Sequence, residues 1–382
     1  MALRIQKDKD ADFAQTNELI SELVFSDYSL SNFEILGSDF VPNNSVDTTT
    51  ITTANTRQAL TGQNKWAGGV LASNGYIYCI PFDATNILIV NPTTNTVNAT
   101  QVVNLPSTSG KWFGGVLAGN GKIYAAPYNS TSVLIFDPET ETVDLTSISG
   151  LSGSAKYSGA VLGSDGKIYC IPSNETAVLV INPLTNTTSR IETGFSSTSK
   201  WSGGVIGSNG IIYCVPQDID RILAINTSTQ TVSSITDAAI TSDAGKWKGG
   251  VLSQSGLIYF VPSTSTSVLI FNPSTNAVDV STITGFSGQS KWSSGIFTPS
   301  GFIYCAPDSS AATGILAINT RTNASSIIAI SSLQSSGNYC GAVLAPNSAV
   351  YGVPFNATNI FIQKSGIPRY PAWMISAEFN KF

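Results

Sequence analysis

The chain has 382 residues, a formal net charge of −5 and no histidine. The lack of histidine excludes Ser-His-Asp triads, Cys-His pairs and metal sites built on imidazole. Charged residues make up only 11% of the chain, against roughly 25% in an average soluble protein. Residues 1–45 hold three basic and eight acidic side chains and so account for the whole net charge. The neutral remainder argues against a nucleic-acid partner.

Residues 1–45 are predicted to form an anchoring arm that is partly helical. Met1–Lys9 is charged and has no apolar core, so no signal peptide is expected. No apolar run approaches the roughly 18 residues of a membrane span, so membrane insertion is not expected either. Asp12–Phe25 has apolar residues at helical spacing. The arm is expected to dock onto a partner, or alternatively to fold back on its own propeller ring. Its candidate anchoring residues are Leu19, Leu23, Tyr28, Phe33 and Phe40.

A repeated unit begins near residue 65 and returns six more times. Each unit carries an aromatic residue at its start, and the spacings between successive aromatics are 46, 45, 44, 46, 45 and 47 residues. A period in the forties with several short strands per unit is typical of a β-propeller blade. The sequence therefore predicts an all-β, seven-bladed propeller over residues 46–364. The seven aromatics are Trp66, Trp112, Tyr157, Trp201, Trp247, Trp292 and Tyr339.

The first unit shows how a blade of four strands is expected to form. Gly68–Leu71 is predicted to be the first strand, and Asn74-Gly75 is predicted to form a type I′ hairpin turn. Ile77–Ile80 is the second strand and ends at a proline, which cannot donate to a ladder. Ile87–Val90, an apolar run, is the third strand, and a polar outer strand follows from Val97. The glycine pair that opens the first strand is interpreted as a means for crowded inner strands to approach each other.

The seventh unit lacks a fourth strand, because the chain after Lys364 does not continue the repeat. Residues 45–51 match the fourth-strand sequence of residues 142–148. An N-terminal strand at about 46–51 is therefore predicted to complete the last blade, which removes exposed sheet edges. Residues 365–382 form a short C-terminal tail, predicted to leave from the same face as the arm. The candidate anchoring residues of the tail are Tyr370, Trp373, Phe379 and Phe382.

The opposite face is predicted to be free for a ligand, and it carries the loops before each first strand and after each second strand. A lysine precedes the aromatic in six units, and polar residues follow the second strands. Aromatic planes with amides and hydroxyls suit a sugar ring. The alternative is that the aromatics pack blade against blade. The candidate ligand-binding residues are Lys65, Trp66, Lys111, Trp112, Lys156, Tyr157, Lys200, Trp201, Lys246, Trp247, Lys291, Trp292, Tyr339, Asp83, Asn129 and Asn174.

Catalysis is not expected from the sequence. A pair of carboxylates could act on a glycoside, but the acids that follow second strands are scattered over three blades, as Asp83, Asp218 and Asp308. No cysteine or carboxylate spacing indicates a metal site, and no glycine-rich motif indicates a cofactor. The chain is therefore predicted to be non-enzymatic, with no cofactor and no metal.

The units resemble β-propeller repeats of the kelch and YVTN families. The glycine pair before Ile-Tyr is similar to kelch, and the sequence from Gly121 to Val143 is similar to YVTN. The Trp-x-Gly-Gly-Val-Leu repeats with Ser-, Thr- and Asn-rich surfaces resemble propeller proteins of tailed bacteriophages, including cyanophages. This resemblance implies a structural or adhesin component of a virion, such as a tail fibre or decoration protein.

The leading functional hypothesis follows from that resemblance together with the arm and the tail. The protein would be made in the host cytoplasm and located in the virion, where residues 1–45 and 365–382 anchor it to other virion proteins. The propeller would contact the host surface or a glycan. Two alternatives stay open: a cellular propeller scaffold for protein–protein interaction, and a free lectin-like glycan binder.

Overall fold

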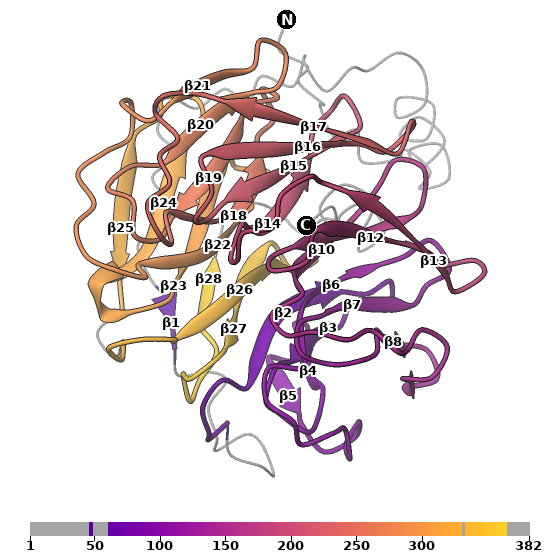
Figure 1. Ribbon diagram of the computed structural model, residues 1–382. Coiled ribbons are helices and arrows are strands. Elements are labelled where there is room, and N and C mark those ends of the chain that lie inside the picture. The colour runs from indigo at the N-terminus through magenta and orange to yellow at the C-terminus, as the bar shows by residue number, and fades with distance from the viewer. Residues whose placement is uncertain (1–45, 49–59, 331–332, 365–382) are drawn as a thin grey trace, which may run out of the picture. The chain divides into compact units, whose positions relative to one another are not determined.

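The computed structural model describes residues 46–48, 60–330 and 333–364, which form seven antiparallel sheets of four strands each. The sheets follow one another around a central axis, and the first strand of each sheet lies nearest that axis (Figure 1). The predicted seven-bladed propeller is confirmed. The predicted helix within 12–25 and the tail lie outside the described residues. Among the residues that are described, no helix is long and apolar enough to cross a membrane.

The first four blades each take their strands from one continuous stretch of the chain. Blade 1 holds β2 (Trp66–Leu71), β3 (Ile77–Pro81), β4 (Leu88–Asn91) and β5 (Thr96–Asn98). Blade 2 holds β6 (Trp112–Leu117), β7 (Ile123–Pro127), β8 (Leu134–Asp137) and β9 (Thr142–Asp144). Blade 3 holds β10 (Tyr157–Leu162), β11 (Ile168–Pro172), β12 (Ala177–Asn182) and β13 (Thr187–Glu192). Blade 4 holds β14 (Trp201–Ile206), β15 (Ile211–Pro216), β16 (Arg221–Asn226) and β17 (Thr231–Thr236).

The remaining blades follow the same order, except that the last one borrows a strand. Blade 5 holds β18 (Trp247–Leu252), β19 (Ile258–Pro262), β20 (Leu269–Asn272) and β21 (Ala277–Asp279). Blade 6 holds β22 (Trp292–Phe297), β23 (Phe302–Pro307), the 3₁₀ turn η3 (Ser310–Ala312), β24 (Gly314–Asn319) and β25 (Ser325–Ala329). Blade 7 holds β26 (Tyr339–Leu344), β27 (Ala349–Pro354), β28 (Ile362–Lys364) and β1 (Val46–Asp47).

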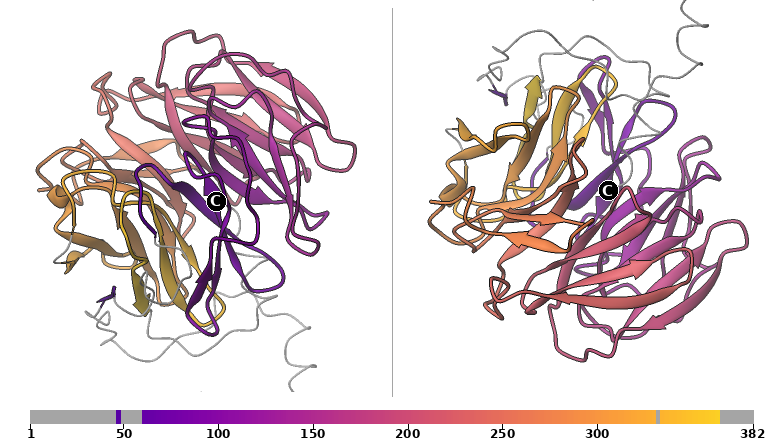
Figure 2. Two further views of the ribbon diagram at one scale, coloured as in Figure 1. Left: turned by 90° about the horizontal axis from the view of Figure 1, so that it is seen from below. Right: turned by 90° about the horizontal axis from the view of Figure 1, so that it is seen from above.

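The N-terminal strand β1 closes the last blade, as the repeat pattern predicts. It pairs antiparallel with β28, with Val46 opposite Gln363 and Asp47 opposite Ile362. Residues 49–51 of the predicted strand lie outside the described residues. Two chain segments about 300 residues apart thus share one sheet, so the ends of the ring are joined by main-chain hydrogen bonds as well as by packing. In both views of Figure 2 the indigo strands of blade 1 lie beside the yellow strands of blade 7, where the ring closes.

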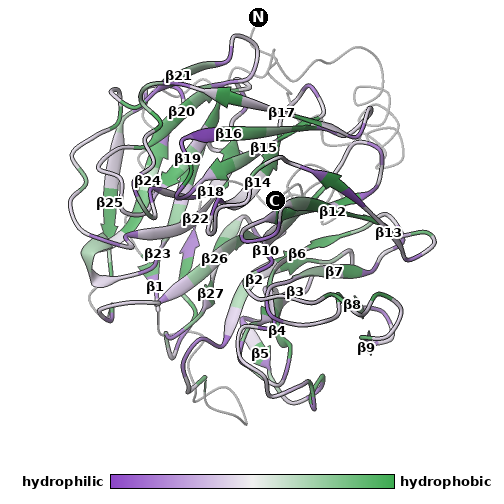
Figure 3. Cartoon of the chain, viewed as in Figure 1, coloured by the Kyte–Doolittle hydropathy of each residue, from purple (hydrophilic) through white to green (hydrophobic). Residues whose placement is uncertain are grey.

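Apolar side chains fill the space between neighbouring blades. Each core cluster draws on two or more adjacent blades, and the largest joins blade 7 to blades 6 and 1. The second and third strands are apolar, whereas the outer strands carry more polar residues, as the colouring in Figure 3 shows. Burial of apolar area between blades is the main stabilising term for the ring.

The hairpin between the first two strands differs from the predicted type I′ turn. A type I′ turn needs positive φ at both central residues, but only Gly75 has one, at 82°. Ala72 N donates to Tyr76 O at 3.0 Å, and Gly75 N donates to Ala72 O at 3.0 Å. The loop therefore has three residues, and its last one is left-handed. The prediction is wrong because the strand register leaves a loop of three residues rather than two, and blade 5, which has Ser255 in place of Asn74, forms the same turn. Within the turn, Asn74 Nδ2 donates to the Tyr78 hydroxyl at 2.9 Å.

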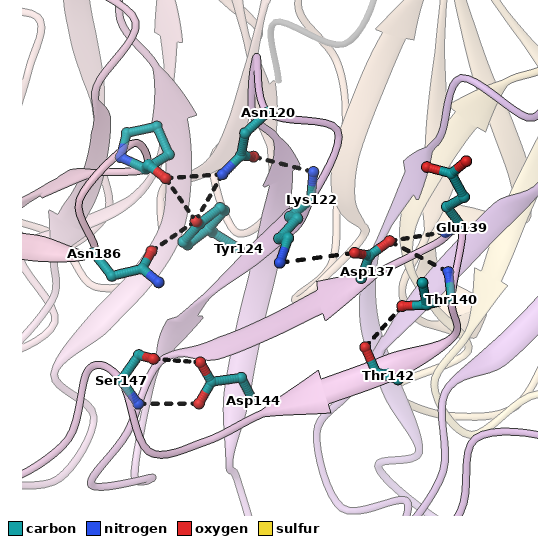
Figure 4. Close-up of polar contacts among 11 residues, drawn as sticks. Asn120, Lys122, Tyr124, Asp137, Glu139, Thr140, Thr142, Asp144, Ser147 and Asn186 are labelled. Atoms are coloured by element: carbon teal, nitrogen blue, oxygen red, sulfur yellow. Dashed lines mark hydrogen bonds and ion pairs between the residues drawn. The ribbon is translucent and has the colours of Figure 1, made fainter.

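Second-strand tyrosines link several blades to the next. In blade 2 the Tyr124 hydroxyl oxygen lies 2.8 Å from Asn186 Oδ1 and 3.2 Å from Pro183 O, two acceptors of blade 3 that are both within reach of its one proton (Figure 4). Asn120 Nδ2 donates to the same proline carbonyl at 2.8 Å. In blade 7, Tyr351 reaches Asn95 Oδ1 of blade 1 at 2.6 Å, across the closure of the ring. These hydrogen bonds join neighbouring blades on the face opposite the predicted ligand face.

A ring of glycines surrounds the axis where the inner strands are closest. Gly68 has a φ of 84°, and a methyl group added there would lie 2.8 Å from Gly114 Cα of the next blade. Gly114 stands in the same relation to Gly159 of blade 3, at 3.1 Å. A bulge in each first strand, between Trp66 and Gly69 in blade 1, brings the glycine to this position. The predicted role of these glycines as spacers for crowded inner strands agrees with this geometry.

Substituting Gly68→Ala should destabilise the ring more than Gly75→Ala does. The two glycines have nearly equal φ, 84° and 82°, so the conformational cost of about 1–2 kcal/mol is shared. A methyl group at Gly75 meets nothing within 4 Å, whereas at Gly68 it meets backbone at 2.8 Å. Chemical denaturation should show Gly68→Ala to be at least about 1 kcal/mol worse than Gly75→Ala. Equal losses would mean that the axis is not tightly packed.

Candidate functional site

The repeated aromatics that the sequence proposed for ligand contact are buried between blades. All seven have exposures of 3% or less. The indole Nε1 of each tryptophan in this set donates to a main-chain carbonyl at the start of the third strand of its blade or just before it, for example Trp112 to Ser132 O at 2.8 Å. Tyr157 lies in the core between blades 2 and 3, and the Tyr339 hydroxyl donates to Asn359 Oδ1 at 2.5 Å. The structure thus supports the packing alternative, and these rings have no surface with which to stack a ligand.

The lysines that precede those aromatics are buried too, and they tie neighbouring blades together. Lys200 Nζ donates to Ser197 O of its own loop at 2.7 Å and to Ser173 O of the preceding blade at 2.8 Å. Lys111, Lys246 and Lys291 make the same pair of bonds. Lys65 and Lys156 each donate to the carbonyl three residues earlier. In blade 7, Asn338 takes this place and donates to Asp308 O at 3.0 Å.

Burial disfavours the charge on these lysines. It lowers the pKa of Lys65, Lys111, Lys200, Lys246 and Lys291 to about 8, and it lowers the pKa of Lys156. Nearby carboxylates such as Glu175 act in the opposite direction on the pKa of Lys200. A neutral amine still has two N–H donors, so it can satisfy both carbonyls without the cost of burying a charge.

The predicted polar ligand residues after the second strands also hold loops together. Asp83 Oδ1 accepts from Gly110 N at 2.6 Å, and Asn129 Oδ1 accepts from Ala155 N at 2.8 Å. Asn174 Oδ1 accepts from Ser199 N at 2.8 Å. Each bond joins a blade to the loop that precedes the next blade. The lysines, aromatics and these three residues therefore gather at one level of the ring, where they form its blade-to-blade contacts.

The residues that face the open end of the axis are the immediate neighbours of these contacts in the sequence. They follow the buried aromatic at the start of a first strand, or follow the proline that ends a second strand. Phe82, Phe113, Tyr128 and Phe355 occupy such places in blades 7, 1 and 2, and all are partly exposed. Phe82 is central: its ring centroid lies 5.4 Å from Phe355, 5.6 Å from Tyr128 and 6.0 Å from Phe113. We call these four side chains the aromatic quartet.

An ion pair occupies equivalent places in blades 5 and 6. Lys248 follows Trp247, and Asp308 follows Pro307; Lys248 Nζ lies 3.2 Å from Asp308 Oδ2. Burial raises the pKa of Tyr128, and the charge of Lys248 acts in the opposite sense on it. Burial likewise raises the pKa of the Cys340 thiol to about 12, with smaller effects from Asp308 and Lys248. Asp308 and Phe355 hold the same position in adjacent blades 6 and 7, and Lys248 holds in blade 5 the position that Phe113 holds in blade 2. The pair and the quartet therefore surround one opening, which we call the axial mouth.

A cavity of about 130 Å³ lies on the axis at this opening. Its walls are the inner-strand glycines together with Phe113, Ser158, Ser202, Ser293 and Cys340. Ser294 also lines it, in the place that glycine takes in the other blades, and its buried Oγ has no hydrogen-bond partner in the part of the chain that the structure describes. The site thus has an apolar side, an ionic side and a polar floor. Within residues 46–48, 60–330 and 333–364, no group of three or more Cys, Asp or Glu residues is placed to hold a metal.

The axial mouth is hard to predict from residue types alone, because it depends on the side to which each side chain points. Asp308 resembles Asp83 and Asp218 in following a second strand, but Asp308 follows its proline directly and those two stand one position later. Side chains alternate between faces along an extended chain, so one position decides between the mouth and a loop contact. The feature of the sequence that could have indicated the mouth is this alternation next to the repeated aromatic and proline positions.

Comparisons with known proteins agree with the fold. A family model described as "Domain of unknown function (DUF5074)" matches residues 38–296, and the chain belongs to that family. The matched family is neither of the two repeat families that the sequence resembles. No curated protein matches the sequence.

Several solved structures are similar in fold. A streptogramin B lyase has a TM-score of 0.66 at 11% identity, covering 80% of this chain and 96% of the other. Virginiamycin B lyase from Staphylococcus aureus has a TM-score of 0.67 at 13% identity, covering 84% and 99%. The extracellular domain of a hybrid two-component system from B. thetaiotaomicron has a TM-score of 0.61 at 10% identity, covering 80% and 39%. At these identities the likeness concerns the fold.

These neighbours overturn the prediction that the chain is not an enzyme. Two of the similar propellers are lyases, so the architecture carries catalysis as well as binding. The prediction is wrong because it considers only histidine sites and paired carboxylates in one blade. A propeller axis collects side chains from different blades, and in this chain it brings the Lys248 amine within 3.2 Å of the Asp308 carboxylate of the next blade.

The lowered pKa of the buried lysines predicts that the free energy of unfolding depends on pH. Substitution of one lysine isolates its contribution. With a pKa of about 8 in the folded protein and 10.5 when unfolded, Lys200 is charged in both states below pH 8. Between these values the folded protein has lost the proton and the unfolded chain retains it, so stability rises with pH. The free energy of unfolding of the wild type minus that of Lys200→Met should rise by about 1–3 kcal/mol from pH 7 to pH 10.

Taking this difference removes the contributions of buried cysteines and tyrosines, which are the same in both proteins. Urea denaturation at four or five pH values gives the two free energies. A difference that stays constant over this range would show that Lys200 keeps its proton in the folded state.

Proposed function

We propose that the protein is a recognition propeller that binds a sugar unit at the axial mouth. The observation that carries this proposal is the aromatic quartet beside the Lys248–Asp308 pair. Sugar rings have one apolar face that packs on aromatic planes and hydroxyls that need hydrogen-bond partners. Both features occur within the mouth, whereas the repeated lysines and aromatics are occupied in holding blades together.

The position of the quartet supports binding more than packing. Its four members stand at places where the other blades carry small or polar residues, such as Ser158, Ser173 and Ser202. Large rings there do not fill the wedge between blades, which the buried tryptophans already occupy. An aromatic group that adds little to the core and remains partly exposed is typical of a ligand-binding surface.

Phe82→Ala should weaken sugar binding at least tenfold, because Phe82 contacts the other three rings of the quartet. A tenfold loss corresponds to about 1.4 kcal/mol, which is in the range expected for one aromatic contact. A glycan array identifies binding sugars, and calorimetry with the best of them measures the affinity. Phe286→Ala is the matched control, since Phe286 is partly buried against Trp292 in another core cluster. If no sugar binds to the full chain, the proposal is wrong.

Catalysis at the same mouth is a second candidate function. An elimination needs a group that removes a proton and a group that stabilises the leaving atom. Asp308 and Lys248 are ionisable and pair at 3.2 Å beside the axis, and Tyr128 belongs to the quartet at the same mouth. Two lyases share this fold. Mass spectrometry of a bound ligand after incubation distinguishes the two functions: cleavage by the wild type that is lost in Asp308→Asn supports catalysis, and an intact ligand supports recognition.

We also propose where the protein is located. Residues 1–45 and 365–382 anchor the propeller to a larger assembly, and the resemblance to phage proteins suggests a virion. The aromatic content of both segments supports an anchoring role, since free polar linkers do not need such side chains.

The full chain should sediment with phage particles from an infected lysate, and a chain limited to residues 46–364 should not. The truncated chain keeps every strand that the sheets of the ring contain, so the difference tests the termini alone. Thermal unfolding of the truncated chain verifies that its ring is intact. If neither chain sediments with particles, the virion assignment is wrong, and the scaffold and free-lectin alternatives become the ones to test.

A further inference from the structure

The Lys248–Asp308 pair has bonding capacity that the protein itself does not use. The six lysines at the blade contacts give their N–H groups to carbonyls, but Lys248 Nζ, among the described residues, contacts only Asp308 Oδ2. An ammonium has three donors, and a carboxylate has about four acceptor sites. Asp83 and Asp218 accept main-chain N–H groups, at 2.6 and 2.7 Å, whereas Asp308 accepts from Lys248 alone among the described residues.

Both partners are accessible from the axial mouth. The Lys248 side chain is 27% exposed, and that of Asp308 is 14% exposed. They come from adjacent blades, so the pair spans a blade boundary at the rim. The quartet faces the same opening, because Phe355 and Asp308 directly follow the prolines that end the second strands of adjacent blades. A ligand lying on the quartet therefore reaches a free donor and a free acceptor side by side.

We propose, on the basis of the proposed function, that the sugar bound at the axial mouth is uncharged and that the Lys248–Asp308 pair selects against carboxylated sugars. Adjacent hydroxyls of a neutral ring match the pair: one oxygen accepts from Lys248, and the neighbouring O–H donates to Asp308. Such a ligand leaves the ion pair intact and adds no charge to a partly buried site.

Charged ligands are disfavoured by one member of the pair or the other. A sugar carboxylate near Lys248 also lies near Asp308, and two like charges at this distance repel strongly in a partly buried site. A cationic ligand near Asp308 also lies near Lys248 and is repelled by its charge. The pair thus acts as a repulsive element against charged competitors, in addition to binding the neutral ring.

The test compares neutral and carboxylated sugars on a glycan array. The array carries hexosides, each paired with the uronic acid of the same stereochemistry. The readout is the ratio of neutral to carboxylated signal for each pair. The wild type should favour the neutral sugar at least tenfold. Asp308→Asn keeps the shape and leaves Lys248 unpaired, so the ratio should move toward the uronic acid by at least tenfold. That new binding should weaken with added salt.

Lys248→Met is the matched variant with the opposite charge change. It should lose signal for the neutral sugar without any gain for the uronic acid, because Asp308 remains and repels the carboxylate. Thermal unfolding shows whether both variants keep the wild-type fold, and the double variant Lys248→Met/Asp308→Asn, which has no pair, should show no preference by charge.

The outcomes separate the two levels of the proposal. A wild type that binds uronic acids as well as neutral sugars overturns the selection while the sugar-binding function stands. A ratio that does not move in Asp308→Asn overturns the role of the pair. A wild type that binds no sugar overturns the proposed function and this inference together.

Discussion

The close approach of seven inner strands at the axis is the constraint on which the rest of the ring depends. An added methyl group at Gly68 would lie 2.8 Å from the backbone of the next blade, and glycine holds this position in six blades, with Ser294 in blade 6. Because the inner strands nearly touch, the blades diverge outward and leave wedge-shaped gaps. The tryptophans and the apolar third strands fill those gaps. Crowding at the centre and large side chains further out are thus two consequences of one geometry.

That geometry also explains how the chain uses its few charges. Residues 46–364 hold 14 basic and 15 acidic side chains, but the six lysines at blade contacts are buried. Eight basic residues then remain against 15 acids, so the exterior of the ring is more acidic than its composition suggests. In this setting Lys248, a partly exposed lysine at the axis, stands out from the other lysines of the repeat.

The repeat made most of the fold predictable from sequence. The spacing of the aromatics gives the number of blades, and the match between residues 45–51 and 142–148 predicts the closing strand. The candidate site was less predictable, because composition alone does not show which side of an extended segment a residue faces. Lys65 and Trp66 look suited to a ligand, yet packing requires them, whereas Phe82 shows no motif. The turn at Asn74-Gly75 was predicted wrongly, because the strand register that leaves a three-residue loop does not follow from the Asn-Gly pair alone.

Comparison of the seven blades with one another separates the two kinds of position. Where packing fixes the residue type, the same side chain returns: lysine occurs in six blades, and proline ends every second strand. The position that directly follows each proline varies freely, as Phe82, Tyr128, Ser173, Gln217, Ser263, Asp308 and Phe355. A scaffold with sevenfold repetition needs no such variety there. The variation divides the mouth into an aromatic side and an ionic side, and an asymmetric opening of this kind can orient an asymmetric ligand where a symmetric one could not.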